Sequence, residues 1–181
     1  MVSDEEFINR FREGDRAALG ELLKRHLPQV RRLVFQITLN DGAADDLSQE
    51  VWLRVVRGLA GFDGRSKFST WLYRIAKNVA CTWLERESRR ATNGTPELLE
   101  AVEATATAPD QRLLTLELTT DVEAALAQLS PSLRSALVLT ALHGVAPAEV
   151  AAIEDCTVST IYWRVHTARE QLRKALQEHL P

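Results

Sequence analysis

The chain has 181 residues, enough for one domain or two small ones. Of these residues 45% are apolar and 26% are charged, and no uncharged apolar stretch is long enough to cross a bilayer, which excludes a membrane-spanning protein. A net charge of −3 argues against a free-standing nucleic-acid-binding protein, although residues 1–90 carry a net +3 and residues 91–120 a net −4. The two cysteines, Cys81 and Cys156, have no Cys or His at ligand spacing, which excludes a zinc knuckle and a disulfide scaffold.

The N-terminal segment predicts a short helix. Ser3 and Glu6 have the spacing of a capping box, and the helix that they open is expected to end near Arg12. The acidic first residues lack the basic and apolar parts of an export signal. We therefore expect a protein that stays in the cytoplasm and does not insert into a membrane.

Apolar residues at helical spacing predict three further helices before residue 91. The first is expected to begin at residue 16 and to follow an apolar pattern as far as residue 37. The second is expected over residues 41–59 and the third over residues 67–90, with a loop at residues 61–66. Pro28 is expected to kink or split the first of these helices, and Asp41 to cap the second.

The composition changes after Arg90. Two segments rich in Thr, Ala and Pro, residues 91–96 and 105–109, flank a short Glu/Leu stretch that cannot bury enough apolar area to fold alone. Helices resume near Asp110. We therefore predict an all-α chain of two small helical domains, residues 1–90 and 112–181, joined by a flexible acidic linker over residues 91–111.

The second domain has the layout of a helix-turn-helix unit. A helix opens at Ser130-Pro131 and ends at Gly144, a short helix follows over residues 147–153, and Thr157 is expected to cap a last helix to about Leu180 after a tight break. In the last helix the apolar positions that should face inward are Ile161, Val165, Ala168 and Leu172.

The outward face of that last helix carries an unusual aromatic pair, Tyr162 and Trp163. The residues left facing outward are Val158, Ser159, Tyr162, Trp163, His166 and Thr167. Large aromatics are normally buried, so these two are candidates to meet base edges in a major groove, while Arg164, Arg169, Arg173 and Lys174 hold phosphates. In the alternative, the unit is an ordinary helical hairpin whose Tyr162 and Trp163 pack on the other domain.

The helix over residues 41–59 has apolar residues around more than half of its circumference, which is too wide for one core. Leu47, Val51 and Val55 form its inward stripe. A second face, suited to docking another helix, comprises Asp46, Gln49, Glu50, Leu53 and Arg57. The acidic residues Asp45, Asp46 and Glu50 could instead be metal ligands, but no histidine joins them and acids in a first helical turn already interact with the helix dipole.

The helix over residues 67–90 combines basic and aromatic residues. Thr70, Arg74, Lys77 and Asn78 are expected opposite its core stripe, with Trp71 and Tyr73 at the borders. Such a face suits single-stranded nucleic acid, and the preceding loop from Phe62 to Lys67 could cup an extruded base. A solvated basic face with buried tryptophans is the alternative.

No catalytic constellation is recognisable. The four histidines are scattered without an acid at catalytic spacing, and neither a Gly-rich phosphate loop nor a metal cluster is present, so we expect neither an enzyme nor a cofactor.

Two signatures in the sequence resemble those of the extracytoplasmic-function (ECF) group of bacterial RNA polymerase sigma factors, in the sigma-70 family. Residues 45–54 and 62–78 resemble sigma region 2, and residues 129–169 resemble region 4. The resemblance covers nearly the whole chain apart from the linker. It implies a sigma factor that binds core RNA polymerase, recognises minus-35 promoter DNA and melts the minus-10 element.

The resemblance also implies a role for each face. The polymerase would be bound by Asp46, Gln49, Glu50, Leu53 and Arg57. The minus-10 element would be bound by Phe62, Asp63, Arg65, Lys67, Thr70, Trp71, Arg74, Lys77 and Asn78. The minus-35 element would be bound by Val158, Ser159, Tyr162, Trp163, Arg164, His166 and Arg169.

Two other functions remain open at this point. An autonomous helix-turn-helix regulator would use the last helix but leave the second face of residues 41–59 without a role. A helical adaptor or sequestering protein of the transcription machinery would use both exposed faces for protein contacts. An anti-sigma factor is a further partner that the resemblance implies.

Overall fold

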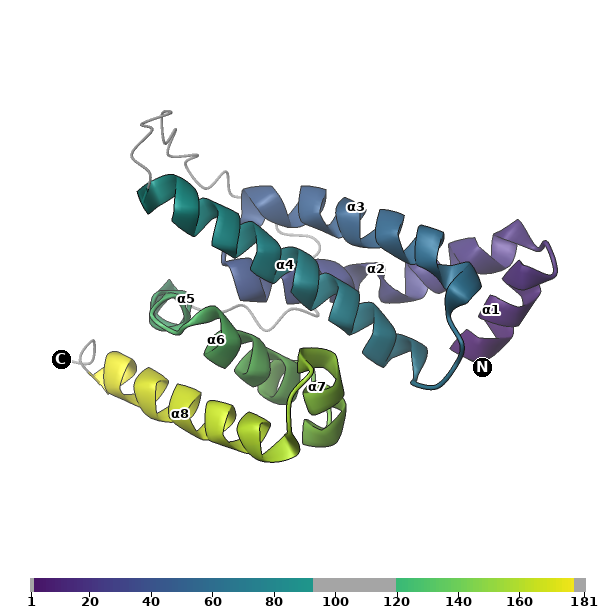
Figure 1. Cartoon of the computed structure of the whole chain (residues 1–181). Helices are drawn as coiled ribbons and strands as arrows, with labels where there is room; N and C mark the ends of the chain where they lie inside the picture. Colours follow the sequence, from purple (N-terminus) through teal and green to yellow (C-terminus); the bar gives the residue numbers. More distant parts are fainter. Residues whose placement is uncertain (1, 93–119, 178–181) are drawn as a thin grey trace.

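The computed structural model describes residues 2–92 and 120–177, and within these ranges every regular element is a helix (Figure 1). The first domain comprises α1 (Asp4–Arg12), α2 (Arg16–Thr38), α3 (Asp41–Gly58), the short turn η1 (Leu59–Gly61) and α4 (Phe68–Thr92). The second comprises α5 (Thr120–Ala127), α6 (Pro131–Leu137), the π-helical turn η3 (Val138–Leu142), α7 (Pro147–Glu154) and α8 (Val158–Gln177). The predicted fold class is confirmed. The predicted linker and the helix expected from Asp110 to residue 119 lie outside the described residues.

Side-chain caps explain where the first helices begin. Ser3 Oγ accepts a hydrogen bond from the Glu6 amide at 3.1 Å, and Asp15 Oδ1 accepts one from the Ala17 amide at 3.0 Å. The prediction that Asp41 caps α3 is wrong, because Asn40 Oδ1 accepts from the Ala43 amide at 2.8 Å instead. Asp41 is the first residue inside the helix.

Pro28 does not split α2, which runs unbroken through it. The proline is exposed, so water can reach the carbonyl of Lys24, which has no amide partner at Pro28. The split that the sequence suggested is therefore absent.

The core of the first domain lies between α2, α3 and α4. Leu33 and Ile37 of α2, Val51 of α3, and Phe68 and Leu72 of α4 are all almost completely buried. The apolar spacing of residues 67–90 also predicts Ile75 and Trp83 on the buried side of α4, and both are only half-buried. None of the described helices has both the length and the apolar content needed to cross a bilayer.

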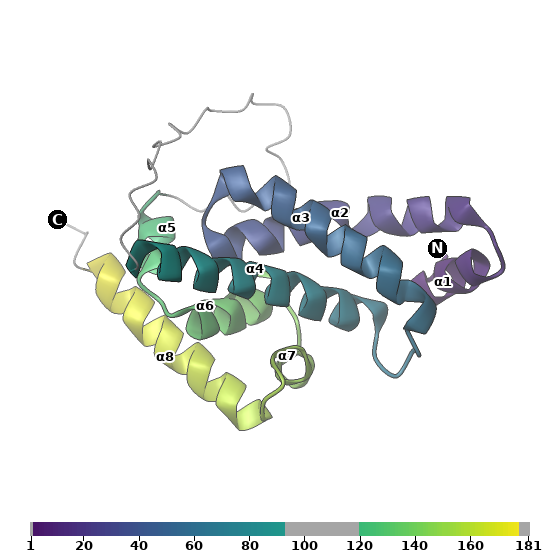
Figure 2. The same cartoon turned by 45° about the horizontal axis from the view of Figure 1, so that its top comes forward.

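The two domains pack directly on each other rather than lying apart. In Figures 1 and 2, α6 lies between α8 and the first domain, and α7 lies beside α4. Val138, Leu139, Val150 and Ile153 of the second domain belong to the same buried cluster as the core of the first. A smaller separate cluster, around Leu126, Leu129, Leu133, Leu137 and Ala168, holds α5, α6 and α8 together.

Candidate nucleic-acid and protein interfaces

The outward face of α8 carries the exposed aromatic pair that the sequence predicted. Tyr162 and Trp163 are 61% and 62% exposed. Val158, Ser159, His166 and Arg169 are also exposed. Because both rings are open to solvent, the alternative in which they pack on the other domain does not describe this structure.

The turn before α8 is a tight one. Asp155 closes α7 in the left-handed conformation, with φ of 53°, and Asp tolerates this conformation better than most residues. Thr157 Oγ1 then accepts a hydrogen bond from the Thr160 amide at 3.2 Å, as expected of the residue that caps α8. The helix-turn-helix geometry is therefore present at α7 and α8.

Arg164 does not face outward, contrary to its predicted phosphate contact. Its guanidinium donates a hydrogen bond to the carboxylate of Glu154, and the two form an ion pair. The Glu154 side chain is completely buried, whereas the Arg164 side chain is 22% exposed. An arginine held by a buried carboxylate faces its own domain, whereas the predicted DNA contact places Arg164 at the duplex.

The second face predicted for α3 is exposed. Leu53 is 51% exposed and is accompanied by the exposed residues Asp46, Gln49 and Arg57, while Glu50 is half-buried and pairs with Arg54 at 2.8 Å. Val56, 42% exposed, extends the apolar part of this face and was not predicted. The face therefore combines apolar and charged groups.

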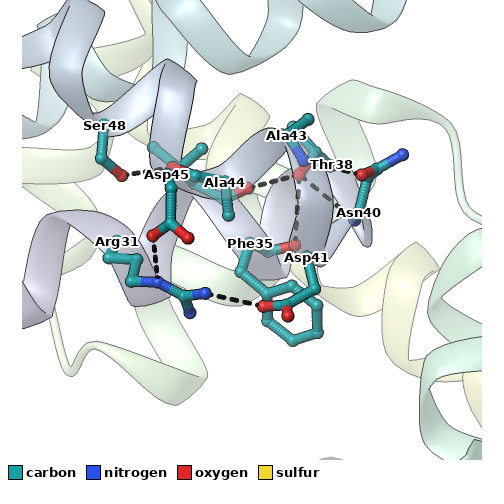
Figure 3. Close-up of polar contacts among 10 residues, drawn as sticks. Arg31, Phe35, Thr38, Asn40, Asp41, Ala43, Ala44, Asp45 and Ser48 are labelled. Atoms are coloured by element: carbon teal, nitrogen blue, oxygen red, sulfur yellow. Dashed lines mark hydrogen bonds and ion pairs between the residues drawn. The ribbon is translucent and has the colours of Figure 1, made fainter. Parts of the chain in front are cut away.

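The metal alternative for α3 finds no support in the geometry. Arg31 of α2 binds Asp45 Oδ1 at 2.6 Å and Asp41 Oδ1 at 2.8 Å, as Figure 3 shows. The hydrogen bond to Asp45 and the nearby carboxylates raise the pKa of Arg31. Residues 2–92 and 120–177 contain no group of three or more His, Cys, Asp or Glu side chains that could hold a metal ion.

The loop between α3 and α4 is fixed by a hydrogen bond within the loop and by another from α1. Asp63 Oδ1 accepts from the Arg65 amide at 3.1 Å, and Gly64 between them has φ of +73°, which glycine adopts without strain. The Arg12 guanidinium of α1 donates to the Phe62 carbonyl. Asp63, Arg65 and Lys67 remain exposed on this loop.

Phe62 and Thr70 are buried, 6% and 8% exposed, so the prediction that Thr70 lies on the face opposite the core is wrong, and the Phe62 ring is not open to a base in this arrangement. The Phe62 ring packs at 6.0 Å from Phe68 and 5.2 Å from Trp71. Thr70 lies one turn before Arg74, whose guanidinium donates to the Ala152 carbonyl of α7. Trp71 is half-buried, between the two alternatives that its sequence position left open.

Two of the predicted nucleic-acid contacts on this face are bonded to α7. Lys67 Nζ lies 2.6 Å from Glu149 Oε1, and Arg74 donates to the Ala152 carbonyl. Asn78 is exposed and Lys77 is half-buried. The basic face of α4 is thus partly covered by the second domain.

Other contacts between the domains involve residues that the sequence did not single out. Arg134, 6% exposed, donates to the Ile37 carbonyl at 2.8 Å, and burial lowers its pKa. His143 Nε2 lies 2.9 Å from Gln36 Oε1, with the Tyr73 ring at 5.6 Å. Burial, with a smaller effect of Arg32, lowers the pKa of His143 to about 4. These pairs are about a hundred residues apart in the chain, so no sequence spacing could reveal them.

His26 also has a partner that the sequence did not show. Its Nε2 lies 2.8 Å from Asp4 Oδ2 of α1, and its ring packs edge-on against Phe68 at 5.4 Å. The two residues are 22 positions apart in the chain, so their spacing in the sequence did not indicate the pair. The pair lies inside the first domain, where it joins α1 to the core.

Comparison with known proteins shows similarity over both domains. The family model described as "Sigma-70 region 2" matches residues 22–90, and "Sigma-70, region 4" matches residues 119–172. The chain is 32% identical to the ECF RNA polymerase sigma-E factor of Escherichia coli (strain K12), over 98% of this chain and 96% of that protein. It is 33% identical to the ECF RNA polymerase sigma factor SigE of Mycolicibacterium smegmatis over 92% of this chain, and it spans 65% of that longer protein.

A solved structure has the same arrangement of helices. The sigma factor RpoE from Bartonella quintana, in complex with the anti-sigma factor NepR, superposes with a TM-score of 0.72 at 26% identity, covering 88% of this chain and 96% of that one.

Proposed function

The chain belongs to the ECF group of the sigma-70 family and is therefore a promoter-recognising sigma factor, not an enzyme, and we propose that its two domains divide core polymerase binding and promoter recognition between three surfaces. The proposed domains are residues 1–90 and 112–181. The observation that carries the proposal is the exposure of Tyr162 and Trp163, 61% and 62%, on the second helix of a helix-turn-helix unit.

Core RNA polymerase binds the second face of α3. Leu53, half exposed, is surrounded there by Asp46, Gln49, Glu50 and Arg57, and Val56 widens the apolar contact. An apolar centre with a polar rim is the usual composition of a protein interface. Neither Asp46 nor Gln49 is needed by the described fold, because neither side chain makes a hydrogen bond or ion pair within it.

The minus-10 element binds the α4 face and the loop before it. Asp63, Arg65, Lys67, Arg74, Lys77 and Asn78 supply charge and hydrogen bonds there, with Trp71 at the border. Phe62 and Thr70 are buried beneath this surface and support it. Since Lys67 and Arg74 are bonded to α7, the second domain must move away before both cations can reach DNA.

The minus-35 element binds α8 in the major groove. Tyr162 and Trp163 contact base edges, Val158, Ser159 and His166 border them, and Arg169 holds a phosphate. The net charge of +2 from Thr157 onward limits the number of phosphate contacts, so this domain binds duplex weakly without the polymerase.

We place the protein in the cytoplasm, with its polymerase. An anti-sigma factor is a further proposed partner, since the similar RpoE was solved in complex with one. A partner that holds the two domains in the packed arrangement would keep Lys67 and Arg74 covered.

Transcription with purified components tests the proposal. Transcript start mapping after overexpression identifies a promoter, and core polymerase then transcribes that promoter with or without the chain. We expect run-off product only when the chain is present and no other sigma factor is needed. A requirement for another sigma factor would identify an autonomous regulator instead, and polymerase binding without promoter crosslinking would identify an adaptor.

A further inference from the structure

Glu154 is a buried carboxylate that joins three helices of the second domain. Its side chain has no exposed surface, although it is the last residue of α7, at the turn of the helix-turn-helix unit. Ser135 Oγ of α6 donates a hydrogen bond to one carboxylate oxygen, and the Arg164 guanidinium of α8 donates to the other. Ser135 itself is completely buried.

This position is unfavourable for an isolated negative charge. Burial removes the carboxylate from water, and the C-terminal end of a helix carries partial negative charge. Arg164 provides the opposite charge, and Ser135 provides a further hydrogen bond. The carboxylate is therefore stable there only while α8 keeps Arg164 next to it.

The pair also determines which face of α8 points outward. Successive residues of an α-helix are about 100° apart, so Ile161, Arg164 and Ala168 lie towards one side. Ser159, Trp163 and His166 then fall on the opposite side, and all three are exposed. A rotation of α8 that brought Arg164 to the DNA would turn Trp163 away from it.

We infer that Glu154 and Arg164 are positioning residues, which fix the rotation and crossing angle of α8 for reading the minus-35 element, and that Arg164 makes no phosphate contact. This inference rests on the proposed function of α8. It assigns the reading of sequence to Tyr162 and Trp163, and the phosphate contact to Arg169.

The test compares three variants with a matched control, all as full-length chain bound to core polymerase. The variants are Arg164→Leu, Glu154→Leu and the double change, and the control is Arg169→Leu, which removes an exposed cation from the same helix. Promoter affinity is measured at several salt concentrations and on promoters with single minus-35 substitutions. The salt dependence counts phosphate contacts, with a slope change of about 0.9 for each one lost.

We expect Arg164→Leu and Glu154→Leu each to reduce discrimination between minus-35 sequences about fivefold or more, because each leaves one buried charge unpaired and α8 loses its fixed position. The double variant removes both charges, so it should recover folding and much of the discrimination, with the wild-type salt slope. The Arg169→Leu control should weaken binding to all sequences equally and lower the slope by about 0.9.

The inference is overturned if the double variant lowers the slope as the control does, since Arg164 would then contact a phosphate. It is also overturned if both single variants fold and discriminate like the wild type. If a single variant unfolds at too low a temperature to be assayed, the test rests on the salt dependence of promoter affinity in the double variant. Wild-type holoenzyme that ignores minus-35 substitutions would refute the proposed function itself, and this is measured before any variant is made.

Discussion

His143 makes the packing of the two domains sensitive to pH. In the packed arrangement its pKa is about 4, against an ordinary value of 6.5, because the ring is buried and, to a smaller extent, because the positive charge of Arg32 is nearby. Between these two pH values a released His143 takes up a proton that the packed one does not. Packing is therefore unaffected above about pH 7 and weakens as the pH falls, by up to about 2 kcal/mol at pH 5.

Energy transfer between dyes on the two domains measures this effect. We expect transfer to decrease from pH 7.5 to pH 5 in the wild type and to change much less in His143→Gln, which keeps a polar partner for Gln36. An equal pH response in both proteins would show that another group controls the separation.

Arg12 contacts the loop between α3 and α4, the proposed minus-10 loop, from a different helix. Its guanidinium donates to the Phe62 carbonyl, so Arg12→Met should loosen the start of the loop while leaving the core intact. We expect open complexes to be destabilised by about 1 kcal/mol, the usual net contribution of such a hydrogen bond, as measured by their lifetime on promoter DNA. Arg16→Met, which removes an exposed arginine at the start of α2, is the control; an equal loss in that variant would assign the effect to charge alone.

Individual residues were predicted well where the helical pattern alone decides exposure, as at Trp163 and Leu53. Arg164 and Thr70 were not, because what covers them comes from another helix. A helical pattern places Arg164 at the edge of a face, and only the buried Glu154 on α7 draws it inward. Thr70 lies one turn before Arg74, which is bonded to α7, and the pattern of α4 alone does not show this neighbour.

At the scale of elements, α3 has two faces: Val51 and Val55 belong to the core, and the exposed face around Leu53 is the proposed polymerase-binding surface. Changing Gln49 and Glu50 together to Ala should weaken core polymerase binding by about 1–3 kcal/mol if they lie at the centre of the contact. Folding should change little, since the Glu50–Arg54 pair is largely exposed and such pairs contribute little to stability. Titration of labelled chain with core polymerase measures the affinity, and a thermal melt checks the fold.

Glu13→Ala, a change at an exposed residue after α1, is the control for that double variant. Unchanged polymerase affinity in the Gln49 and Glu50 double variant would remove α3 from the interface.

The order and type of the elements followed from the sequence, whereas some of their details did not. Asn40 and Asp41 are both good capping residues and stand next to each other, so the choice depends on backbone geometry that composition does not show. Pro28 is typical of a helix break, but at its exposed position in α2 water can satisfy the carbonyl that loses its amide partner, and the helix continues.

At the scale of the whole molecule, we expect the packing of α7 on α4 to compete with the proposed minus-10 binding. Glu149→Lys places a cation opposite Lys67, where an ion pair of 2.6 Å now exists, so the packed arrangement should be weakened. We expect this variant, in the absence of polymerase, to bind a single-stranded minus-10 oligonucleotide several-fold more tightly than the wild type.

Asp121→Lys makes the same change of charge at an exposed position of α5, and it corrects for the added positive charge. Equal tightening in the two variants would mean that net charge, not opening of the domains, causes the effect. Anisotropy of a labelled oligonucleotide gives both affinities.

The sequence predicted two domains but not their packing. Each domain has its own helical pattern, and neither pattern specifies which residues of the two domains meet. The placement depends on Arg134, His143 and Glu149 meeting carbonyl, amide and ammonium groups in the first domain, and such complementarity appears only once both domains are folded.

The central claim is that one domain opens the minus-10 strands while the other reads intact minus-35 duplex. Its most direct test places a photoreactive amino acid at position 77 or at position 163 and maps the crosslinks in the open complex with core polymerase. Position 77 should crosslink to the non-template strand at the minus-10 element, and position 163 to duplex at the minus-35 element. Crosslinks from both positions to the same promoter element, or from position 163 to protein alone, would contradict the account.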